Sequence, residues 1–349
     1  PPPIKRTRTL LLVGKMTALA KNFFSKLSLS QWVAGTSGVF SAFLLYQGFK
    51  KVFPSYLSFK AAGDSKVVVI SGCDTGFGNL LAKRLDKDGY EVIALCLTEN
   101  GCRELSASCS KRVQVHQFDI SKQEDIDELK KVLTAQQRKI WALVNNAGIA
   151  RTAHIEATSM EAFRQTMEVN LFGHIAITQA LLPLISRGGR IVNMASVAGR
   201  ISAAMMCSYS CSKFAMQAFS DCLRRELNVF GINVSTIAPG FMKTPIIANQ
   251  TDRLRAMWDA VPRETYDRYG KEFIENLFNR IPNLDAIAED PQMVVQAYVH
   301  AIGAKTPQSR YQVGRSAPFI VWFSMLPDSI TDGLMRMTRS PILPVAARL

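Results

Sequence analysis

The sequence lacks acidic residues at its N-terminal end. Residues 1–63 contain nine Lys or Arg and no Asp or Glu, whereas the other 286 residues hold 33 basic and 28 acidic side chains. Most of the net charge of +14 therefore comes from this first segment. Because the remaining residues carry a net charge of only +5, they have no strong electrostatic footprint for nucleic acid, and we expect no nucleic-acid partner.

The chain also lacks any regular spacing of its seven cysteines. Cys102 and Cys109 are separated by six residues, which fits neither a zinc motif nor a C-x-x-C redox pair. An odd number of irregularly spaced cysteines argues against a disulfide framework. We predict reduced cysteines that pack as small side chains, Cys207 and Cys211 included, and no metal site.

Internal repeats and low-complexity tracts are absent as well. Of the 349 residues, 48% are hydrophobic, which argues against disorder and allows a sizeable core. The composition changes after residue 63. We therefore divide the chain into a basic N-terminal segment, residues 1–63, and one folded domain, residues 64–349.

The N-terminal segment contains an apolar stretch near the length of a membrane span. No charged residue occurs at 27–49, and residues 32–49 are mostly apolar before Lys50 and Lys51. This pattern predicts a membrane-anchoring helix at about 32–49. A mitochondrial presequence is the alternative, because the segment is acid-free and rich in Lys and Ser, and a cleaved secretory signal fits least. The chain begins with Pro1, so we expect its natural start to lie upstream or at Met16.

From Lys66 onward, strand patterns alternate with helix patterns. The strand patterns lie at 67–70, 91–97, 113–118, 141–144, 189–194 and 232–238. The helix patterns lie at 78–88, 125–137, 162–182 and 209–230. This alternation predicts an α/β fold of the Rossmann type, with a doubly wound parallel sheet in a single domain.

The regularity fades in the C-terminal part of the chain. Helical pieces at 272–278 and 291–302 precede an apolar run at 319–325. The first interpretation of that run is a packing segment, and the alternative is a membrane-contacting patch, since several Arg residues follow it. We expect residues 245–349 to form a helical region that binds substrate and faces a membrane.

A glycine-rich loop joins the first strand to the first helix. It reads Ser71-Gly72-Cys73-Asp74-Thr75-Gly76-Phe77-Gly78, a G-x-x-x-G-x-G spacing. Glycines permit a tight turn and let the backbone approach a pyrophosphate at the N-terminus of a helix. Because the loop follows a buried strand, it predicts a dinucleotide site.

The end of the second strand bears on which dinucleotide binds. Residues Leu95-Cys96-Leu97-Thr98 offer neither an acid for a ribose hydroxyl nor a base for an extra phosphate. Asp74 in the glycine loop would repel that phosphate, so NAD is preferred over NADP. Asp119 follows the third strand, where its carboxylate can meet the adenine amine; a solvated loop aspartate is the alternative.

Tyr209 and Lys213 are four residues apart, and therefore lie on one face of the helix predicted at 209–230. A neighbouring ammonium favours the phenolate of a tyrosine, and such a phenol can exchange a proton with an alcohol while hydride is transferred to nicotinamide. Most such pairs occur by chance on surfaces, so the surrounding motifs decide the interpretation.

Those motifs occur in a consistent order. Ser196 follows the strand at 189–194, where its hydroxyl can hold a substrate oxygen, and Asn170 lies inside a helix that does not favour asparagine. The fourth strand ends in Asn145-Asn146-Ala147-Gly148, and the sixth is followed by Pro239-Gly240-Phe241-Met242-Lys243-Thr244, a loop that can close over the nicotinamide.

Taken together, this ordered set closely resembles the short-chain dehydrogenase/reductase superfamily over residues 66–250. The resemblance implies that Tyr209 is the acid/base, that Lys213 binds ribose and lowers the pKa of Tyr209, and that Ser196 orients the substrate. It implies that Asn170 holds a water in a proton relay. The expected cofactor-binding residues are Gly72, Asp74, Thr75, Gly76, Phe77, Gly78, Asp119, Asn146, Ala147, Gly148, Tyr209, Lys213, Pro239, Gly240 and Thr244.

Finer motifs are similar to one branch of this superfamily. Cys73-Asp74-Thr75-Gly76-Phe77-Gly78, Cys96-Leu97-Thr98, Ala218-Phe219-Ser220-Asp221-Cys222-Leu223-Arg224 and Arg268-Tyr269-Gly270-Lys271 look like the membrane-associated retinol and hydroxysteroid dehydrogenases, and the pattern is shared by 3-hydroxybutyrate dehydrogenase. Those relatives mainly use NAD. The basic N-terminal segment is longer than the anchors of retinol dehydrogenases, which leaves the compartment open between endoplasmic reticulum and mitochondrion.

Three functions follow as hypotheses. The first is an NAD-dependent dehydrogenase for a lipophilic alcohol, a retinoid or hydroxysteroid, taken up from a membrane. The second is a mitochondrial 3-hydroxybutyrate-type dehydrogenase, for which Lys243 is the candidate partner of a substrate carboxylate. The third is a catalytically silent NAD-binding protein. By family analogy, the helices at 162–182 and 209–230 would pair in a homodimer.

Overall fold

The computed structural model describes residues 66–245, 250–279, 288–337 and 344–347. The chain divides into two units, Pro1–Ser55 and Tyr56–Leu349, and all described residues belong to the second. The predicted anchor at 32–49 and the rest of the basic segment lie outside the described residues. Within them, no helix is both long and apolar enough to cross a bilayer.

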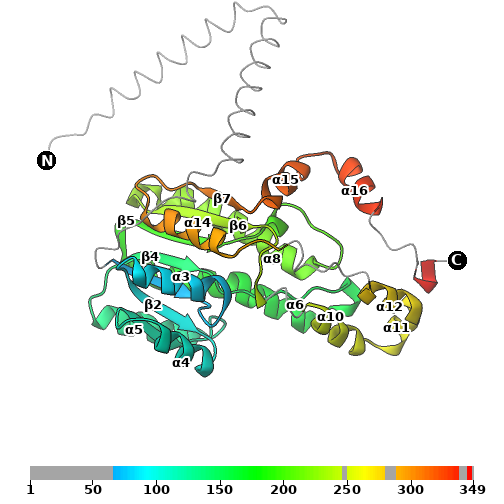
Figure 1. Ribbon diagram of the computed structural model, residues 1–349, viewed down its shortest axis with the longest axis horizontal. Helices are drawn as coiled ribbons and strands as arrows, with labels where there is room; N and C mark the ends of the chain where they lie inside the picture. Colours follow the sequence, from blue (N-terminus) through cyan, green and yellow to red (C-terminus); the bar gives the residue numbers. More distant parts are fainter. Residues whose placement is uncertain (1–65, 246–249, 280–287, 338–343, 348–349) are drawn as a thin grey trace, which may run out of the picture. The chain divides into compact units, whose positions relative to one another are not determined.

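A seven-stranded sheet forms the centre of the domain, in the order β3-β2-β1-β4-β5-β6-β7 (Figure 1). Every neighbouring pair is parallel. The strands are β1 (Val67–Ser71), β2 (Glu91–Cys96), β3 (Val113–Gln117), β4 (Ile140–Asn145), β5 (Ile185–Met194), β6 (Asn233–Pro239) and β7 (Arg310–Val313). The predicted doubly wound parallel fold is confirmed, and its order reverses between β1 and β4, where such folds bind ligands.

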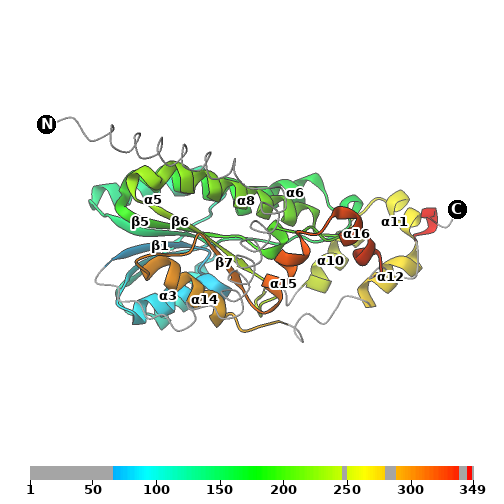
Figure 2. The same cartoon turned by 90° about the horizontal axis from the view of Figure 1, so that it is seen from above.

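Helices cover both faces of the sheet, because alternate strand residues point to opposite sides. Val68 and Ile70 of β1 pack with α3 (Gly76–Lys87), α4 (Glu99–Ser108) and α14 (Gln292–Gly303). Val67 and Val69 pack with α5 (Gln123–Ala135), α7 (Gly173–Leu181) and α8 (Cys207–Glu226). Figure 2 shows these two helical layers above and below the strands.

Beyond the ends of the strands, a third apolar cluster joins α10 (Gln250–Asp259), α11 (Arg263–Tyr269) and α12 (Lys271–Asn279) to the short turn Ile155–Ala157. Trp258 and Phe273 are buried there. Farther along the chain, α15 (Ser316–Phe323) and α16 (Asp328–Met337) follow β7 (Figure 1). The expected helical C-terminal region is therefore present, with one strand in it.

Three details differ from the sequence prediction. The strand β7 and the helix α4 were not predicted; β7 has four residues, of which Arg310 and Gln312 are half-buried, so it gives no apolar run. The long helix predicted at 162–182 is divided into α6 (Met160–Met167), a π turn at Glu168–Phe172 and α7. Finally, Cys207 and Cys211 are exposed on α8 and do not pack as interior residues.

Candidate active site

The glycine loop between β1 and α3 is fixed against the end of β4. A Cβ added at Gly72, which has a φ of +71°, would lie 2.7 Å from the Cα of Ala147. A Cβ at Gly78 would overlap the carbonyl oxygen of Gly72 and lie 2.6 Å from Asn146 Nδ2. Gly76 has a φ of +63° but open space around it, as a ligand at a helix N-terminus requires.

Asn146 holds the two loops together. Its Nδ2 donates hydrogen bonds to the carbonyl oxygens of Ser71 (2.9 Å) and Gly72 (3.0 Å). Its Oδ1 accepts one from the hydroxyl of Tyr298 on α14 (3.1 Å). The Ser71 hydroxyl accepts the main-chain N–H groups of Asn146 and Ala147. Sequence reasoning missed Ser71 and Tyr298, because a serine at a strand end and a tyrosine in an apolar helix carry no distinctive signal.

Asp74 supplies the acid that the second strand itself lacks. Its carboxylate accepts the main-chain N–H groups of Leu97 and Thr98, each at 2.8 Å, and the Thr98 hydroxyl at 2.7 Å. Gly101 packs against it so closely that a Cβ there would lie 2.5 Å from Asp74 Oδ1. The negative charge of Asp74 is therefore fixed at the end of β2, beside Leu97, which lies 23 residues later in the sequence.

The remaining loop residues take separate positions. Thr75 is the exposed residue that precedes α3, and Phe77 packs against the core beneath that helix. Asp119, after β3, accepts the main-chain N–H and hydroxyl of Ser121 through Oδ1, at 3.0 and 2.6 Å. This turn keeps the Asp119 carboxylate at the same edge of the sheet as the glycine loop.

Lys213 lies on α8 one turn after Tyr209, as predicted. Its side chain is 2% exposed, and its Nζ lies 5.6 Å from the centre of the Tyr209 ring. The ammonium donates a hydrogen bond to the carbonyl oxygen of Met194, the last residue of β5, at 3.0 Å. Burial lowers the pKa of Lys213 to about 8.

Ser196 is brought next to Tyr209. Burial raises the pKa of the Tyr209 hydroxyl, and a hydrogen bond with the Ser196 side chain opposes that rise without cancelling it. Burial outweighs the bond with Ser196, so the net direction of the Tyr209 pKa is upward, whereas the family resemblance implied that Lys213 lowers it. The Ser196 hydroxyl also accepts the N–H of Ala198 at 3.1 Å, which fixes its position after β5.

Asn170 lies in the π turn, and it is fully buried. Its side-chain Oδ1 accepts the main-chain N–H of Ile149, and its Nδ2 donates to the carbonyl oxygen of the same residue. The Nδ2 also donates to the Ser212 hydroxyl at 3.0 Å. A Cβ added at Gly148 would lie 3.3 Å from Asn170 Oδ1 and 3.7 Å from Lys213 Nζ. The structure therefore brings Gly148, Asn170 and Lys213 together, beside Tyr209 and Ser196.

The loop after β6 is held by β7 and α15. The Gly240 N–H donates to the carbonyl oxygen of Val313 at 2.9 Å, and a Cβ at Gly240 would overlap the Ser316 hydroxyl. Pro239 is the last residue of β6, and Thr244 is half-exposed just before the undescribed residues 246–249. This loop begins at the same edge of the sheet as the other predicted loops.

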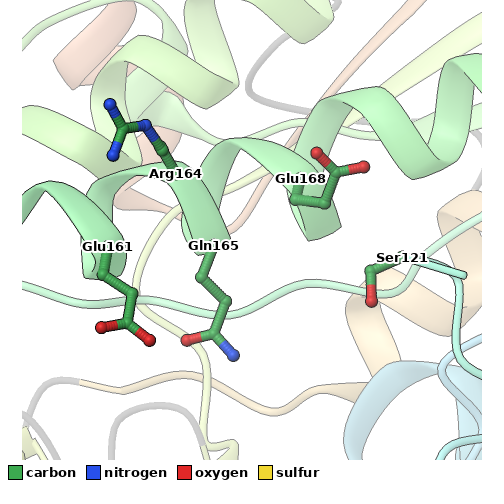
Figure 3. Close-up of a pocket in the computed structure, with 5 residues that line it drawn as sticks. All are labelled: Ser121, Glu161, Arg164, Gln165 and Glu168. Carbon is green, nitrogen blue, oxygen red and sulfur yellow. The ribbon is translucent and has the colours of Figure 1, made fainter.

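A polar hollow outside this cluster lies along α6. It is lined by Ser121, Glu161, Arg164, Gln165 and Glu168, and four of these five come from α6 and the π turn after it (Figure 3). None of them is a predicted site residue. The chemistry-bearing residues meet instead at the strand ends, and within the described residues no group of three or more His, Cys, Asp or Glu could hold a metal ion.

Comparison with known proteins agrees with this geometry. Residues 66–255 match the short chain dehydrogenase family. The chain is 39% identical to mouse short-chain dehydrogenase/reductase family 9C member 7, over 77% of this chain and 88% of that protein. It is 38% identical to bovine 17-beta-hydroxysteroid dehydrogenase type 6 (81% and 90%) and 37% identical to bovine mitochondrial D-beta-hydroxybutyrate dehydrogenase (71% and 76%).

A solved short-chain dehydrogenase from Streptomyces avermitilis is similar in structure, with a TM-score of 0.62 and 25% identity over 78% of this chain and 95% of that one. The family match covers more than half of the chain, and it coincides with the domain that carries the glycine loop, Ser196, Tyr209 and Lys213. The chain therefore belongs to the short-chain dehydrogenase family, the oxidoreductases that use a nicotinamide cofactor to act on CH–OH groups.

Proposed function

We propose that the protein is an NAD-dependent dehydrogenase that interconverts a lipophilic alcohol, a retinoid or hydroxysteroid, and its carbonyl. The observation that carries the proposal is the meeting of Ser196, Tyr209 and buried Lys213 at the strand ends, beside a glycine loop shaped for a dinucleotide. An intact set of this kind also argues against the catalytically silent alternative.

The residues present fit a dinucleotide. The open space around Gly76 lies at the N-terminus of α3, where a pyrophosphate would be stabilised by main-chain N–H groups. The same turn is completed by Thr75, Phe77 and Gly78, and the neighbouring loop after β4 is formed by Asn146, Ala147 and Gly148. Asp119 would meet the adenine. The nicotinamide would be bordered by Pro239, Gly240 and Thr244. The cofactor, when bound, supplies the hydride acceptor or donor.

NAD is favoured over NADP by Asp74. The carboxylate is fixed at the end of β2, where the 2′ position of the adenosine ribose would lie. A ribose hydroxyl can donate to this carboxylate, whereas a 2′-phosphate would be repelled by its charge. No basic side chain replaces it in the segment Leu95-Cys96-Leu97-Thr98.

In the proposed mechanism, Tyr209 exchanges a proton with the substrate oxygen, and the Ser196 hydroxyl holds that oxygen. Because burial raises the pKa of Tyr209, the neutral phenol is a ready proton donor for carbonyl reduction. Alcohol oxidation requires the phenolate, which the Lys213 ammonium would stabilise. Lys213 has three N–H donors and uses one on Met194, so it can also bind ribose hydroxyls. The π turn at Asn170 fixes the position of the loop beside Lys213.

The C-terminal region supports a lipophilic substrate. The cluster of α10, α11 and α12 is lined by aromatic rings: those of Trp258 and Tyr269 are 4.9 Å apart, and His154 lies 5.6 Å from Trp258. A 38% identical relative is named as a hydroxysteroid dehydrogenase. We infer that this lobe, within residues 245–349, receives the apolar part of the substrate.

A membrane would be both partner and source of the substrate. Phe319, Trp322 and Met325 are 64%, 55% and 69% exposed on and after α15, an unusual set of apolar side chains at a surface. Aromatic rings of this kind favour the lipid headgroup region. With the apolar stretch at 32–49, this patch supports association with the endoplasmic reticulum; a mitochondrial location is the alternative.

We also propose a homodimer through α8. Cys207, Cys211, Phe214 and Cys222 are exposed along one face of that helix, which is too apolar to remain in water without cost. Sedimentation analysis of Phe214→Glu tests this: the variant should dissociate, and a variant that sediments as the unaltered protein does would contradict the dimer.

The hydroxybutyrate alternative needs a cation for the substrate carboxylate. Lys243, the candidate from the sequence, has an exposed side chain, and its main-chain N–H pairs with Glu289 at 3.0 Å. The buried Lys213 is already turned toward Met194. These positions favour an apolar alcohol, although a 37% identical relative is named as a hydroxybutyrate dehydrogenase.

The test is a substrate panel on the purified full chain with NAD and NADP, comparing retinol, hydroxysteroids and 3-hydroxybutyrate. We expect NADH formation with a retinoid or steroid, and a loss of at least ~100-fold in Tyr209→Phe. Tyr90→Phe is the matched control, because Tyr90 is a buried tyrosine that directly precedes β2, at the end of the strand away from the proposed site. Unchanged activity in Tyr209→Phe would overturn the mechanism, and activity with 3-hydroxybutyrate alone would favour the alternative.

A further inference from the structure

Glu289 lies at a junction of three parts of the chain, and none of the motifs in the sequence pointed to it. Its main chain pairs with the loop after β6: the Glu289 N–H donates to the carbonyl oxygen of Phe241 at 2.9 Å, and the Lys243 N–H donates to the carbonyl oxygen of Glu289 at 3.0 Å. Met242, which faces Glu289 in this parallel bridge, is buried in the core. These three loop residues belong to the segment that would border the nicotinamide, so Glu289 supports a part of the proposed site.

The side chain of Glu289 reaches a third part of the chain, the residue that precedes α15. Both of its carboxylate oxygens accept the main-chain N–H of Arg315, at 2.8 Å and 3.0 Å. The Arg315 guanidinium contributes little, because its Nε is 4.0 Å from Oε2 and its side chain is 96% exposed. The Glu289 side chain itself is only 17% exposed. Because a carboxylate accepts an N–H more strongly than a neutral oxygen does, the main-chain bond fixes the Glu289 side chain.

Gly314 makes this contact possible. It has a φ of +98°, a conformation that residues with a side chain rarely adopt. A Cβ at Gly314 would lie 2.7 Å from Glu289 Oε1 and 2.6 Å from the terminal methyl carbon of Met242. Both the backbone conformation and the available space therefore require glycine here. The contact between Glu289 and the start of α15 is thus a closely packed part of the fold and differs from a chance ion pair on a surface.

The loop after β6 is attached to the connection between β7 and α15 at two places. At its start, the Gly240 N–H donates to the carbonyl oxygen of Val313 at 2.9 Å. Farther along, Lys243 is attached through Glu289, whose carboxylate bonds Arg315. The residue after Lys243 is the last of the predicted cofactor-binding residues. Glu289 therefore holds the part of the loop that would close over the nicotinamide.

We propose that Glu289 is a positioning residue for the loop that borders the nicotinamide. Its main chain carries the loop at Phe241 and Lys243, and its carboxylate ties this pairing to the start of α15. The loop is thereby held in place before the cofactor binds. In this role Glu289 acts through the loop and does not itself touch cofactor or substrate. The inference rests on the proposed function, because it requires that a nicotinamide dinucleotide binds at the strand ends.

The consequence falls on one half of the cofactor. A loop that is ordered in advance lowers the cost of binding, whereas a loop that must be ordered by the ligand weakens its affinity. The nicotinamide half would lose affinity if the Glu289 carboxylate were removed. The adenosine and pyrophosphate would keep theirs, because the glycine loop and Asp74 lie on other elements. Glu289 thus affects NADH and a ligand without nicotinamide to different extents.

The experiment measures two affinities of the purified full chain and of its Glu289→Ala variant. NADH binding is followed by the fluorescence of NADH, and ADP-ribose, which lacks the nicotinamide ring, is titrated by calorimetry. We expect the Kd of NADH to rise about 10-fold in Glu289→Ala, while the Kd of ADP-ribose changes by less than ~2-fold. A general loss of structure would weaken the binding of both ligands. Glu289→Gln keeps an oxygen acceptor for the Arg315 N–H and should restore most of the NADH affinity.

Glu128→Ala is the matched control, because it removes an exposed carboxylate that pairs with Lys131 on α5 at 3.7 Å, and it should leave both affinities unchanged. If Glu289→Ala does not fold, Glu289→Met takes its place, since an unbranched side chain fills the space without an oxygen acceptor. Equal losses for NADH and ADP-ribose, an unchanged Kd of NADH, or a Glu289→Gln variant as weak as Glu289→Ala would each contradict the inference. An unaltered chain that binds neither ligand would instead refute the proposed function, and with it the inference.

Discussion

Asn170 and Ile149 form a reciprocal pair: the Ile149 N–H donates to Asn170 Oδ1 at 2.8 Å, and Asn170 Nδ2 donates to the Ile149 carbonyl oxygen at 2.9 Å. The same Nδ2 donates to the Ser212 hydroxyl, which donates to the carbonyl oxygen of Tyr209 at 2.7 Å. The amide thus joins the loop after β4 to the helix that carries Tyr209. We therefore expect the relay role implied for Asn170 to come from its main chain at the π turn.

Replacing Asn170 should uncouple these elements. Asn170→Ala removes three hydrogen bonds in a buried setting, so we expect a loss of roughly 2–3 kcal/mol in the free energy of unfolding. Activity should fall at least ~10-fold, because a small displacement of catalytic groups is costly. Urea unfolding and initial rates measure both effects. Asn100→Ala is the control, since Asn100 is exposed on α4 and bonds Glu104 there; equal stability of both variants would contradict the expectation.

The glycine loop offers a second test, in cofactor binding. In Gly78→Ala, the new methyl group meets main-chain atoms of Gly72, which can move only if the whole loop moves. We expect the KM for NAD to rise more than ~10-fold while the alcohol KM changes little. Gly333→Ala is the matched control, because a Cβ at that helical glycine would meet nothing within 4 Å. A normal KM for NAD in Gly78→Ala would show that the loop does not contact the cofactor.

Cofactor choice should depend on Asp74. Asp74→Asn removes the charge and keeps one of the two oxygens, so it can still accept the main-chain N–H of Leu97 or of Thr98, which bond different oxygens of Asp74. We expect the ratio of kcat/KM for NAD over NADP to fall by about 10-fold, because repulsion of the 2′-phosphate is lost. The ratio is measured with the alcohol saturating, and Asp88→Asn, on the far end of α3, serves as control. An unchanged ratio in Asp74→Asn would mean that another group selects the cofactor.

Asp74 also shows where sequence reasoning reached its limit. The strand and helix patterns predicted the Rossmann sheet and all six of its longer strands, because buried parallel strands produce apolar runs that can be recognised locally. The sequence could not show that a residue of the first loop lies at the end of β2, since that contact depends on the sheet order. In the same way, no local signal shows that His174, on α7, is fully buried.

The interruption of the helix predicted at 162–182 has a similar origin. In the π turn Glu168–Phe172, Val169 and Phe172 have helix propensities as mediocre as that of Asn170, so propensity alone does not mark where the helix widens. What widens the helix is tertiary: the Asn170 amide is drawn to Ile149, and Gly173 packs against Ile120. The sequence did identify Asn170 as an unexpected helical residue, which was the available signal that this segment serves the site.

Stability against acid should report on His174. Burial, and then the charge of Lys213, lower its pKa from the ordinary 6.5 to about 3. The unfolded chain therefore binds a proton below pH 6.5 that the native protein does not, and the stability present at neutral pH is lost as the pH falls from 6.5 toward 3. Between pH 7 and pH 5, His174→Leu should lose about 2 kcal/mol less than the unaltered protein.

Urea unfolding at pH 7, 6 and 5 measures that difference. His300→Gln is a useful comparison, because the His300 ring is half-buried and bonded to the Tyr311 hydroxyl. This variant measures the contribution of His300 to the pH dependence separately from that of His174. If the unaltered protein and His174→Leu lost stability in parallel, His174 would not be held neutral by its burial.

The exposed aromatic patch after β7 gives the last prediction, on membrane association. Phe319 and Trp322 have ring centres 5.9 Å apart on α15, with Met325 next to them, and Ile330 and Leu334 are exposed on α16. Arg315 at the start of α15 has a side chain that is 96% exposed, so an anionic lipid surface would meet both apolar and basic groups. The double variant Phe319→Ser/Trp322→Ser should reduce co-flotation with vesicles of phosphatidylcholine and phosphatidylserine at least ~10-fold. The reason is that burial of each ring in the lipid would contribute roughly 1–2 kcal/mol to the free energy of membrane binding.

Residues 1–63 could dominate vesicle binding in the full chain. The double substitution is therefore made both in the full chain and in a chain that begins at residue 64. The folding of the shorter chain is first verified by its melting transition. Val229→Ser is the control, because Val229 is a strongly exposed apolar residue in the 3-10 turn Leu227–Phe230 that follows α8. Turnover of a water-soluble short-chain alcohol should be unaffected by the double substitution, whereas turnover of retinol carried in vesicles should fall. Equal flotation of the altered and unaltered forms of the shorter chain would leave the apolar stretch at 32–49 as the sole source of membrane affinity and would contradict a lipid-facing role for α15.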